Sequence, residues 1–255
     1  MTREGSSAGP SRGALLGYMV ARAIAVGVSR AYLPGRVTGR ENLPESGAYL
    51  VAPVHRSYVD WLIVARITGR RRLRYIAKAE IWRSKPLGRI LEALGVFPVN
   101  RAGTDREALE RCQEVLAGGE PLVMFPEGTR RSGPLVEDLR EGVAYLALRA
   151  GVPVVPIGIG GSERAMPRGS AIPRPRRVEV VIGKPIYPPS RSPAQGSVAG
   201  AEEPPDPHGA GRMPLRAGRV SRRATRELSD EIAAGIQAVF DQAQRLAGVD
   251  EAPPG

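Results

Sequence analysis

A histidine and an aspartate five residues apart form the first pair in this sequence that could do chemistry. His55 follows a short apolar run, and Asp60 comes five residues later. In one continuous helix these side chains would point about 140° away from each other. A strand-to-helix turn at His55 would instead let them meet. The imidazole could then accept a proton from a hydroxyl, while the carboxylate fixes its tautomer.

The same residues also have a simpler explanation. Ser57, with Asp60 three residues later, is the pattern of a helix start in which Ser57 is the N-cap. Asp60 would then be only a capping acid, and His55 an ordinary loop histidine. Because a histidine and an aspartate at this spacing often occur by chance, the pair alone does not identify a site.

Three further blocks follow along the chain. Arg101 ends Gly-Val-Phe-Pro-Val-Asn-Arg, residues 125–130 read Phe-Pro-Glu-Gly-Thr-Arg, and residues 152–158 read Val-Pro-Val-Val-Pro-Ile-Gly. With His55 and Asp60, these blocks resemble, in order and separation, the glycerolipid acyltransferase family with the HxxxxD motif. That family includes the 1-acylglycerol-3-phosphate acyltransferases. The resemblance covers roughly residues 45–187.

The resemblance implies an O-acyltransferase of phospholipid biosynthesis. It would transfer a fatty acyl group from a thioester to the free hydroxyl of 1-acylglycerol-3-phosphate (lysophosphatidic acid), giving phosphatidic acid. His55 would be the general base and Asp60 would orient it, with direct attack by the alcohol. A covalent route through Ser57 is the competing mechanism, and Cys112 is a weaker nucleophile. Acyl-CoA or acyl-carrier protein would be the co-substrate, with no cofactor and no metal.

The acceptor's phosphate requires fixed cations, for which the planar fork of arginine is well suited. Arg101 and Arg130 resemble the family's phosphate-binding residues. Glu127 is expected to orient Arg130 or a neighbouring backbone, because a carboxylate would repel phosphate. Gly128 would permit a close approach, and Thr129 would donate a hydrogen bond. Taken alone, this block also fits an ordinary turn with an exposed acid.

Alternating strands and helices must position these residues. Apolar runs predict strands over residues 48–53, 73–77, 96–99, 122–125, 152–159 and 178–182, and helices over residues 58–68, 86–94, 105–116 and 141–149. This pattern predicts an α/β fold, a single domain with a mixed, largely parallel sheet flanked by helices. His55, Arg101 and Glu127 each follow a predicted strand, and Lys78 near the end of another would add positive charge. One cleft at the carboxyl ends of the strands could hold them all.

An N-terminal amphipathic helix is predicted over residues 13–35. Its apolar stripe consists of Leu16, Met19, Val20, Ala23, Ile24 and Gly27. Arg22 in mid-segment would make a bilayer crossing cost about 2.5–3.5 kcal/mol, which favours a helix lying in the membrane interface. The same stripe could also cover the core of its own domain.

The chain therefore divides into segments of different kinds. We expect a disordered N-terminus (1–12), the membrane-associating helix (13–35), the acyltransferase domain (36–187), a disordered Pro/Gly/Arg-rich insertion (188–221), a C-terminal docking helix (222–248) and a tail (249–255). The insertion contains the second histidine, His208, for which nothing suggests a catalytic role.

The net charge of +11 predicts a polyanionic partner. Aromatic residues make up only 5% of the chain, which argues against nucleic acid and for an anionic membrane surface. The single cysteine, Cys112, excludes an internal disulfide and suggests a reducing compartment. No signal peptide is expected, so the predicted location is the cytoplasmic face of the cell membrane, peripheral or monotopic.

Two alternatives remain at this stage. The acceptor could be another lysophospholipid or membrane alcohol, because a phosphodiester could use the same arginines. A non-catalytic basic protein that binds membranes or nucleic acid would also explain the charge, but it would make the four motif blocks coincidences.

Overall fold

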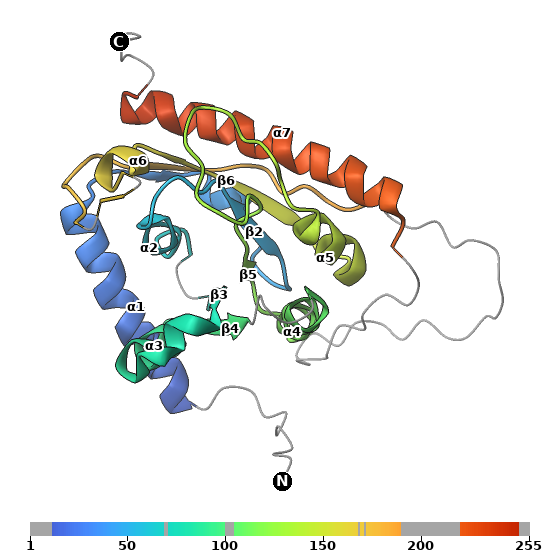
Figure 1. Ribbon diagram of the computed structural model, residues 1–255, viewed down its shortest axis with the longest axis horizontal. Coiled ribbons are helices and arrows are strands. Elements are labelled where there is room, and N and C mark those ends of the chain that lie inside the picture. The colour runs from blue at the N-terminus through green and yellow to red at the C-terminus, as the bar shows by residue number, and fades with distance from the viewer. Residues whose placement is uncertain are drawn as a thin grey trace, which may run out of the picture.

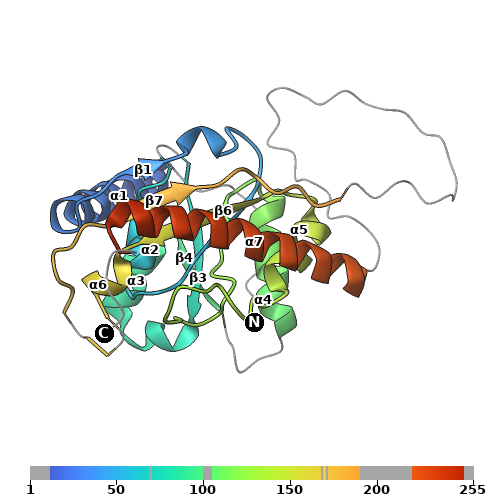
Figure 2. The ribbon, with the colours of Figure 1, turned by 90° about the horizontal axis from the view of Figure 1, so that it is seen from above.

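The structure is a computed structural model that describes residues 12–68, 71–99, 105–167, 169–170, 172–189 and 220–249. Its strands are β1 (Val37–Thr38), β2 (Leu50–Pro53), β3 (Arg74–Lys78), β4 (Val96–Val99), β5 (Leu122–Val123), β6 (Val154–Gly160) and β7 (Glu179–Ile182). Within the described residues they form one seven-stranded sheet in the order β1-β7-β6-β2-β5-β3-β4 (Figures 1 and 2). Only the β6–β7 pairing is antiparallel among these strands. The predicted mixed, largely parallel sheet of a single α/β domain is confirmed.

Helices flank this sheet. They are α1 (Arg12–Tyr32), α2 (Asp60–Val64), α3 (Lys85–Ala93), α4 (Asp105–Ala117), α5 (Gly142–Ala150), α6 (Ser162–Ala165) and α7 (Arg222–Ala247), with 3-10 turns η1 (Arg40–Asn42) and η2 (Ala79–Arg83). Helix α1 contacts α2 and α3, whereas α5 contacts α4 and α7 (Figure 1). Every residue of β2 and β6 is buried, which explains why these strands are continuous apolar runs without alternation.

Helix α7 packs directly on the backbone of β6. A Cβ atom placed on Gly158 would lie 2.1 Å from the carbonyl oxygen of Val239. Two residues further along the strand, a Cβ on Gly160 would lie 2.1 Å from the carbonyl oxygen of Ala243. The two glycines therefore create the groove in which α7 lies, and any side chain there would push the helix away.

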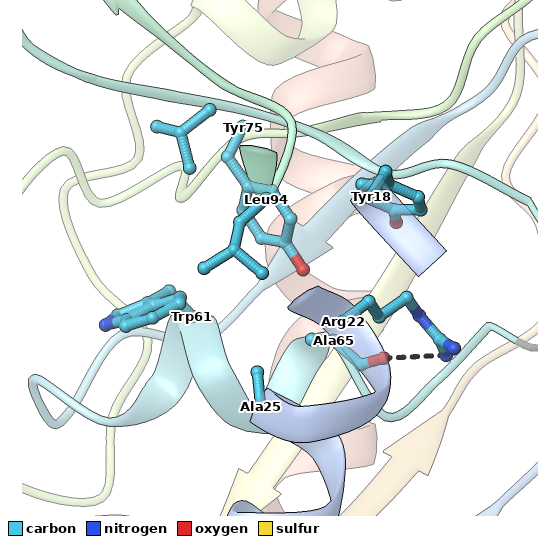
Figure 3. A pocket seen from close by; sticks show the side chains of 8 residues that line it. Tyr18, Arg22, Ala25, Trp61, Ala65, Tyr75 and Leu94 are labelled. Atoms are coloured by element: carbon cyan, nitrogen blue, oxygen red, sulfur yellow. Dashed lines mark hydrogen bonds between the residues drawn. The ribbon is translucent and has the colours of Figure 1, made fainter. Parts of the chain in front are cut away.

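Helix α1 docks through its more polar face. Figure 3 shows Tyr18, Arg22 and Ala25 of α1 around a small cavity that is closed from the other side by residues including Trp61 and Tyr75. Arg22 donates from Nη2 to the carbonyl oxygens of Ala65, at 3.0 Å, and Thr68.

Hydrogen bonds from an arginine also run in the other direction, from the α2 region to α1. Arg66, which follows α2 and is buried, donates to Ser29 and to the carbonyl oxygen of Leu33 at 2.7 Å. Burial lowers the pKa of the Arg66 guanidinium to about 10, which still leaves it charged at neutral pH. Arginines from each side therefore satisfy carbonyl groups at the end of the other helix.

The apolar stripe of α1 faces solvent. Its large side chains, Leu16, Met19, Val20 and Ile24, are 52–64% exposed, and Val28 next to the stripe is 60% exposed. The helix therefore does not use this stripe to cover the core, so the second role considered for it is excluded by the structure. None of the helices in the described ranges combines the length and hydropathy that a bilayer crossing requires.

Three sequence expectations differ from the structure. The helix predicted over residues 58–68 spans only Asp60–Val64, and the backbone after it tightens into i→i−3 turns in which Arg66 donates to Ile63 at 2.9 Å and Ile67 to Val64 at 3.1 Å. Ser57 is not its N-cap, a position held by Val59. Strand β1 was not predicted, because two residues are too few to show the alternation of apolar and polar side chains that indicates a strand. Residues 1–11, 190–219 and 250–255, most of which were expected to be disordered, lie outside the described residues.

We predict that Gly158→Ala lowers the free energy of unfolding by about 1–3 kcal/mol, because the added methyl group collides with the α7 backbone. Gly27→Ala is the matched control. Gly27 lies on the exposed side of α1, and a Cβ atom added there would have no neighbour within 4 Å, so alanine should stabilise by about 0.5–1 kcal/mol. Urea denaturation measures both. Equal stability of the two variants would contradict close packing of α7 on β6.

Candidate active site

The carboxyl ends of β2 and β5 lie side by side. The two strands are parallel neighbours, with Leu50 opposite Leu122 and Val51 opposite Val123. The turn that carries His55 follows β2, and the loop that carries Glu127 follows β5. Both therefore emerge at the same edge of the sheet, where ligands gather in open α/β folds.

His55 and Asp60 are in contact. His55 Nδ1 lies 2.9 Å from Asp60 Oδ2, and the same oxygen accepts the backbone N–H groups of Arg56 and Ser57, each at 2.7 Å. Asp60 is fully buried at the start of α2, where the helix dipole favours a negative charge. The carboxylate therefore fixes the ring and leaves Nε2 as the free nitrogen. The His55 side chain is 20% exposed, so a substrate can reach it.

A buried ion pair holds the backbone of this turn. Arg56 Nη1 lies 2.6 Å from Glu127 Oε1, and each side chain is 1% exposed. The other carboxylate oxygen of Glu127 accepts the backbone N–H of His55 at 2.8 Å. Glu127 therefore joins the β5 loop to both His55 and its neighbour.

Arg56 also connects the turn to more distant segments. It donates to the carbonyl oxygens of Gly133, at 3.2 Å, and Leu135, at 2.7 Å. Its guanidinium lies over the ring of Phe240 in α7, 4.9 Å from the centroid. This arginine is a structural group that faces inward, and it is not available to a substrate.

Arg130 is a cation held beside the same turn. Its guanidinium lies over the ring of Tyr58, 3.2 Å from the centroid. Its Nη1 atom is buried and has no hydrogen-bond partner among the described residues. The next residue, Arg131, donates its backbone N–H to the carbonyl oxygen of His55 at 2.9 Å. An anion near His55 could therefore gain a charged donor from Arg130.

An apolar cleft begins next to the histidine. The ring of Phe125 lies against His55, with 4.2 Å between centroids, and also lines a cleft of about 750 Å³. The apolar lining of the cleft includes Ile76, Val99, Leu109, Cys112 and Met124. Burial raises the pKa of the Cys112 thiol to about 12, so it is protonated at neutral pH and a poor nucleophile.

The comparisons with known proteins agree with this site. A family model described as Acyltransferase matches residues 35–160, which contain the His55 turn and the Glu127 loop. The chain belongs to the acyltransferase family. The membership expected from the four sequence blocks is confirmed.

Similar proteins within the family are named for one type of acyl transfer. The chain is 34% identical over 155 residues to a chloroplast 1-acyl-sn-glycerol-3-phosphate acyltransferase of Brassica napus, covering 59% of this chain and 44% of that protein. It is 26% identical to the 1-acyl-sn-glycerol-3-phosphate acyltransferase of Bacillus subtilis, covering 60% and 73%. The matched stretch thus spans less than half of the plant relative.

The fold is shared with a solved structure. The crystal structure of the 1-acyl-sn-glycerophosphate acyltransferase PlsC from Thermotoga maritima has a TM-score of 0.64 to this acyltransferase, at 20% sequence identity. The match covers 93% of this chain and 81% of that one. It therefore includes helices outside the region matched by the family model.

The structure brings most of the predicted site together. His55, Asp60 and Glu127 are joined by hydrogen bonds, and Arg130 lies on Tyr58 of the same turn, whereas Arg101 lies outside the described residues. Lys78 ends β3, where it pairs with Val99 of β4. The catalytic and binding roles assigned to these residues stay predictions.

The loop after β5 differs from its expected arrangement. Glu127 binds a neighbouring backbone, as expected, but its ion-pair partner is Arg56 and not Arg130. Gly128 has a φ of +64°, and a Cβ there would lie 2.4 Å from Nε of Arg140, so the close approach is that of a protein side chain. Thr129 is exposed.

Two residues of this site were missed from the sequence. The role of Arg56 is left open by the sequence, and Tyr58 enters only within the helix predicted over residues 58–68, whereas the structure buries Arg56 and places Tyr58 against Arg130. The position of Arg56 within the buried turn, between His55 and the acid that orients it, was the available signal.

We predict that Glu127→Gln lowers the free energy of unfolding by about 3–5 kcal/mol, because it leaves Arg56 as an unpaired buried charge. Glu227→Gln is the matched control, since Glu227 pairs with Arg223 on the exposed surface of α7 and its loss should change stability very little. Chemical denaturation compares the two. A small effect at Glu127 would mean that Arg56 is not held by this pair.

Proposed function

We propose that this protein transfers a fatty acyl group from acyl-CoA or acyl-carrier protein to the free hydroxyl of 1-acylglycerol-3-phosphate, giving phosphatidic acid. The observation that carries the proposal is the His55–Asp60 contact, 2.9 Å long, at the edge of the sheet where an apolar cleft and an arginine also lie. The names of the relatives favour this acceptor, and no cofactor is needed.

In the proposed step, the hydroxyl oxygen of the acceptor attacks the carbonyl carbon of the thioester. His55 Nε2 takes the hydroxyl proton, while Asp60 stabilises the imidazolium that forms. The tetrahedral intermediate then breaks its C–S bond, and the imidazolium returns the proton to the leaving thiolate. This order needs no covalent enzyme intermediate.

The residues that compete as nucleophiles have other roles. The Ser57 hydroxyl donates its hydrogen to the carbonyl oxygen of Met166 at 3.0 Å. This bond occupies the hydroxyl proton, which argues against Ser57 as the nucleophile. Cys112 is kept protonated by burial, with a raised pKa. Direct attack by the alcohol is therefore the mechanism that these contacts support.

Arg130 is proposed to bind the acceptor's phosphate. Its buried, unpartnered Nη1 offers a charged donor, and stacking on Tyr58 holds the guanidinium in one plane. Arg101 follows β4 in the chain, and we assign it a second phosphate contact from the family resemblance. Two guanidinium groups would suit a phosphate monoester.

The cleft beside Phe125 is proposed to hold the fatty acyl chain. Its lining is largely apolar, and its volume of about 750 Å³ falls within the range of ordinary ligand pockets. Because Phe125 both lines this cleft and touches the His55 ring, an acyl chain in the cleft would present its thioester near the proposed base.

Membrane association is proposed to occur through α1. The exposed residues Leu16, Met19, Val20, Ile24 and Val28 give this helix an apolar outer face, while its inner face is fixed to the domain by arginine hydrogen bonds. We place the protein at the cytoplasmic face of the membrane, where the lysolipid acceptor resides.

We predict that His55→Ala lowers the rate of acyl transfer by about 10²–10⁴-fold, because the base is removed. His208→Ala, which changes the chain's other histidine, should leave the rate unchanged. Transfer of radiolabelled acyl groups from acyl-CoA or acyl-carrier protein to a panel of lysolipids measures both. Full activity in His55→Ala would show that His55 is not the general base. A preference of the unmodified protein for another lysolipid would replace the proposed acceptor.

We predict that Cys112→Phe shortens the acyl chain that the enzyme prefers, because the larger ring would fill part of the cleft that Cys112 lines. The ratio of kcat/KM for a long-chain donor to that for a short-chain donor should fall about tenfold or more, whereas Cys112→Ala should leave it nearly unchanged. An unchanged ratio in a folded Cys112→Phe variant would place the acyl chain elsewhere.

A further inference from the structure

A short basic segment lies at the end of α1. We call residues 172–177, with the sequence Ile-Pro-Arg-Pro-Arg-Arg, the basic segment. The two prolines lack backbone N–H groups and have restricted φ angles, so the segment is stiff and unsuited to pairing as a strand. It belongs to none of the helices and strands described above, and the proposed chemistry does not use it.

The basic segment is held at both of its ends by the last residue of α1 and by Pro34, two residues beyond the helix. The hydroxyl of Tyr32 donates to the carbonyl oxygen of Pro173 at 2.8 Å. The backbone N–H of Val178 donates to the carbonyl oxygen of Pro34 at 2.8 Å. Figures 1 and 2 both show the chain after α6 beside the carboxyl end of α1, at the same edge of the molecule. The segment therefore continues the surface that the exposed face of α1 begins.

The side chains of the basic segment are apolar at one end and cationic along the rest. Ile172 is 74% exposed, more than any other large apolar residue among those described. Arg174 and Arg176 are exposed, and within the described part of the chain neither has an acidic partner. The nearby carboxylate of Glu179 is already bound by Arg177, at 2.7 Å, and by the backbone N–H of Arg36, at 3.0 Å. Two positive charges are therefore left unneutralised beside an exposed isoleucine.

The basic segment is also joined to the proposed active site. The backbone N–H of Arg174 donates to the carbonyl oxygen of Ala165, at the end of α6, at 2.6 Å. The next residue, Met166, accepts the hydroxyl hydrogen of Ser57 at 3.0 Å. Two hydrogen bonds to the adjacent residues Ala165 and Met166 therefore connect the segment and the turn that carries His55 to the same short stretch of backbone.

We infer that the basic segment is a second membrane contact that selects anionic phospholipid, with Arg174 and Arg176 on the phosphate groups and Ile172 inserted among the acyl chains. Arginine binds phosphate, and cationic side chains next to an apolar one fit the interface of an anionic bilayer. An anionic polymer such as nucleic acid would match the charges but would leave Ile172 and the apolar face of α1 exposed. This inference rests on the membrane association proposed for α1.

The test is co-sedimentation of the full-length protein with vesicles of phosphatidylcholine alone and with vesicles that also contain phosphatidylglycerol. The unmodified protein should bind the anionic vesicles more tightly, with an advantage that falls as salt is added. Arg174→Glu/Arg176→Glu should weaken binding to the anionic vesicles about tenfold or more and leave binding to phosphatidylcholine vesicles nearly unchanged. Ile172→Asp should weaken binding to both.

Arg111→Glu/Arg226→Glu is the matched control, because it makes the same change of net charge at exposed positions on α4 and α7. Its effect on the anionic vesicles should be less than threefold. An equal loss in the control would mean that only net charge matters, and would overturn the inference. Unchanged binding of Arg174→Glu/Arg176→Glu to the anionic vesicles would also overturn it. The same holds if this variant loses binding to a DNA duplex and keeps its binding to the vesicles.

Acyl transfer in solution separates this inference from the proposed function. With a short-chain, water-soluble lysophosphatidic acid and no vesicles, Arg174→Glu/Arg176→Glu should react at the rate of the unmodified protein, while His55→Ala should react about 10²–10⁴-fold more slowly. If the unmodified protein itself does not react, the proposed function fails, and the vesicle result still decides the role of the basic segment. A large loss of rate for the Arg174/Arg176 variant in solution would overturn a purely lipid-binding role.

Discussion

Two buried carboxylates hold the turn on which the rest of the site depends. Asp60 Oδ2 accepts three hydrogen bonds from the turn, and Glu127 binds both the Arg56 guanidinium and the His55 backbone. A buried charge without partners would cost several kcal/mol, so each carboxylate is tolerable only while its donors stay in place. The same contacts that offset the cost of burial therefore also fix the direction of the imidazole. A substitution that breaks these contacts should therefore both destabilise the turn and change the orientation of His55.

The parallel sheet explains how Glu127 reaches the turn that Asp60 also binds. Strands β2 and β5 are neighbours although about seventy residues separate them, and both end at the same edge. Glycines in β6 let α7 lie close enough for Phe240 to cover Arg56. The long-range packing thus seals the ion pair from water, and this exclusion of water strengthens it.

Much of this arrangement could be predicted from the sequence, because its signals are local. Continuous apolar runs marked the buried strands β2 and β6, and the turn between β2 and α2 explained how His55 could reach Asp60. The ion pair of Arg56 with Glu127 could not be predicted, since residue type alone places both at the surface. Its partners lie 71 positions apart, and only the strand order brings them together.

Helix α1 is a second feature that the sequence predicted only in part. Its periodicity correctly indicated an amphipathic helix, but periodicity cannot say which face meets the protein. The docked face contains Arg22 and Ser29, whose hydrogen bonds with the α2 region add to the contacts of buried Tyr18, and the face with the larger apolar side chains is left outside. A helix packed this way leaves its largest apolar side chains in water unless another apolar phase covers them. That cost is removed when the outer face of α1 lies in lipid, which is the position proposed for it above.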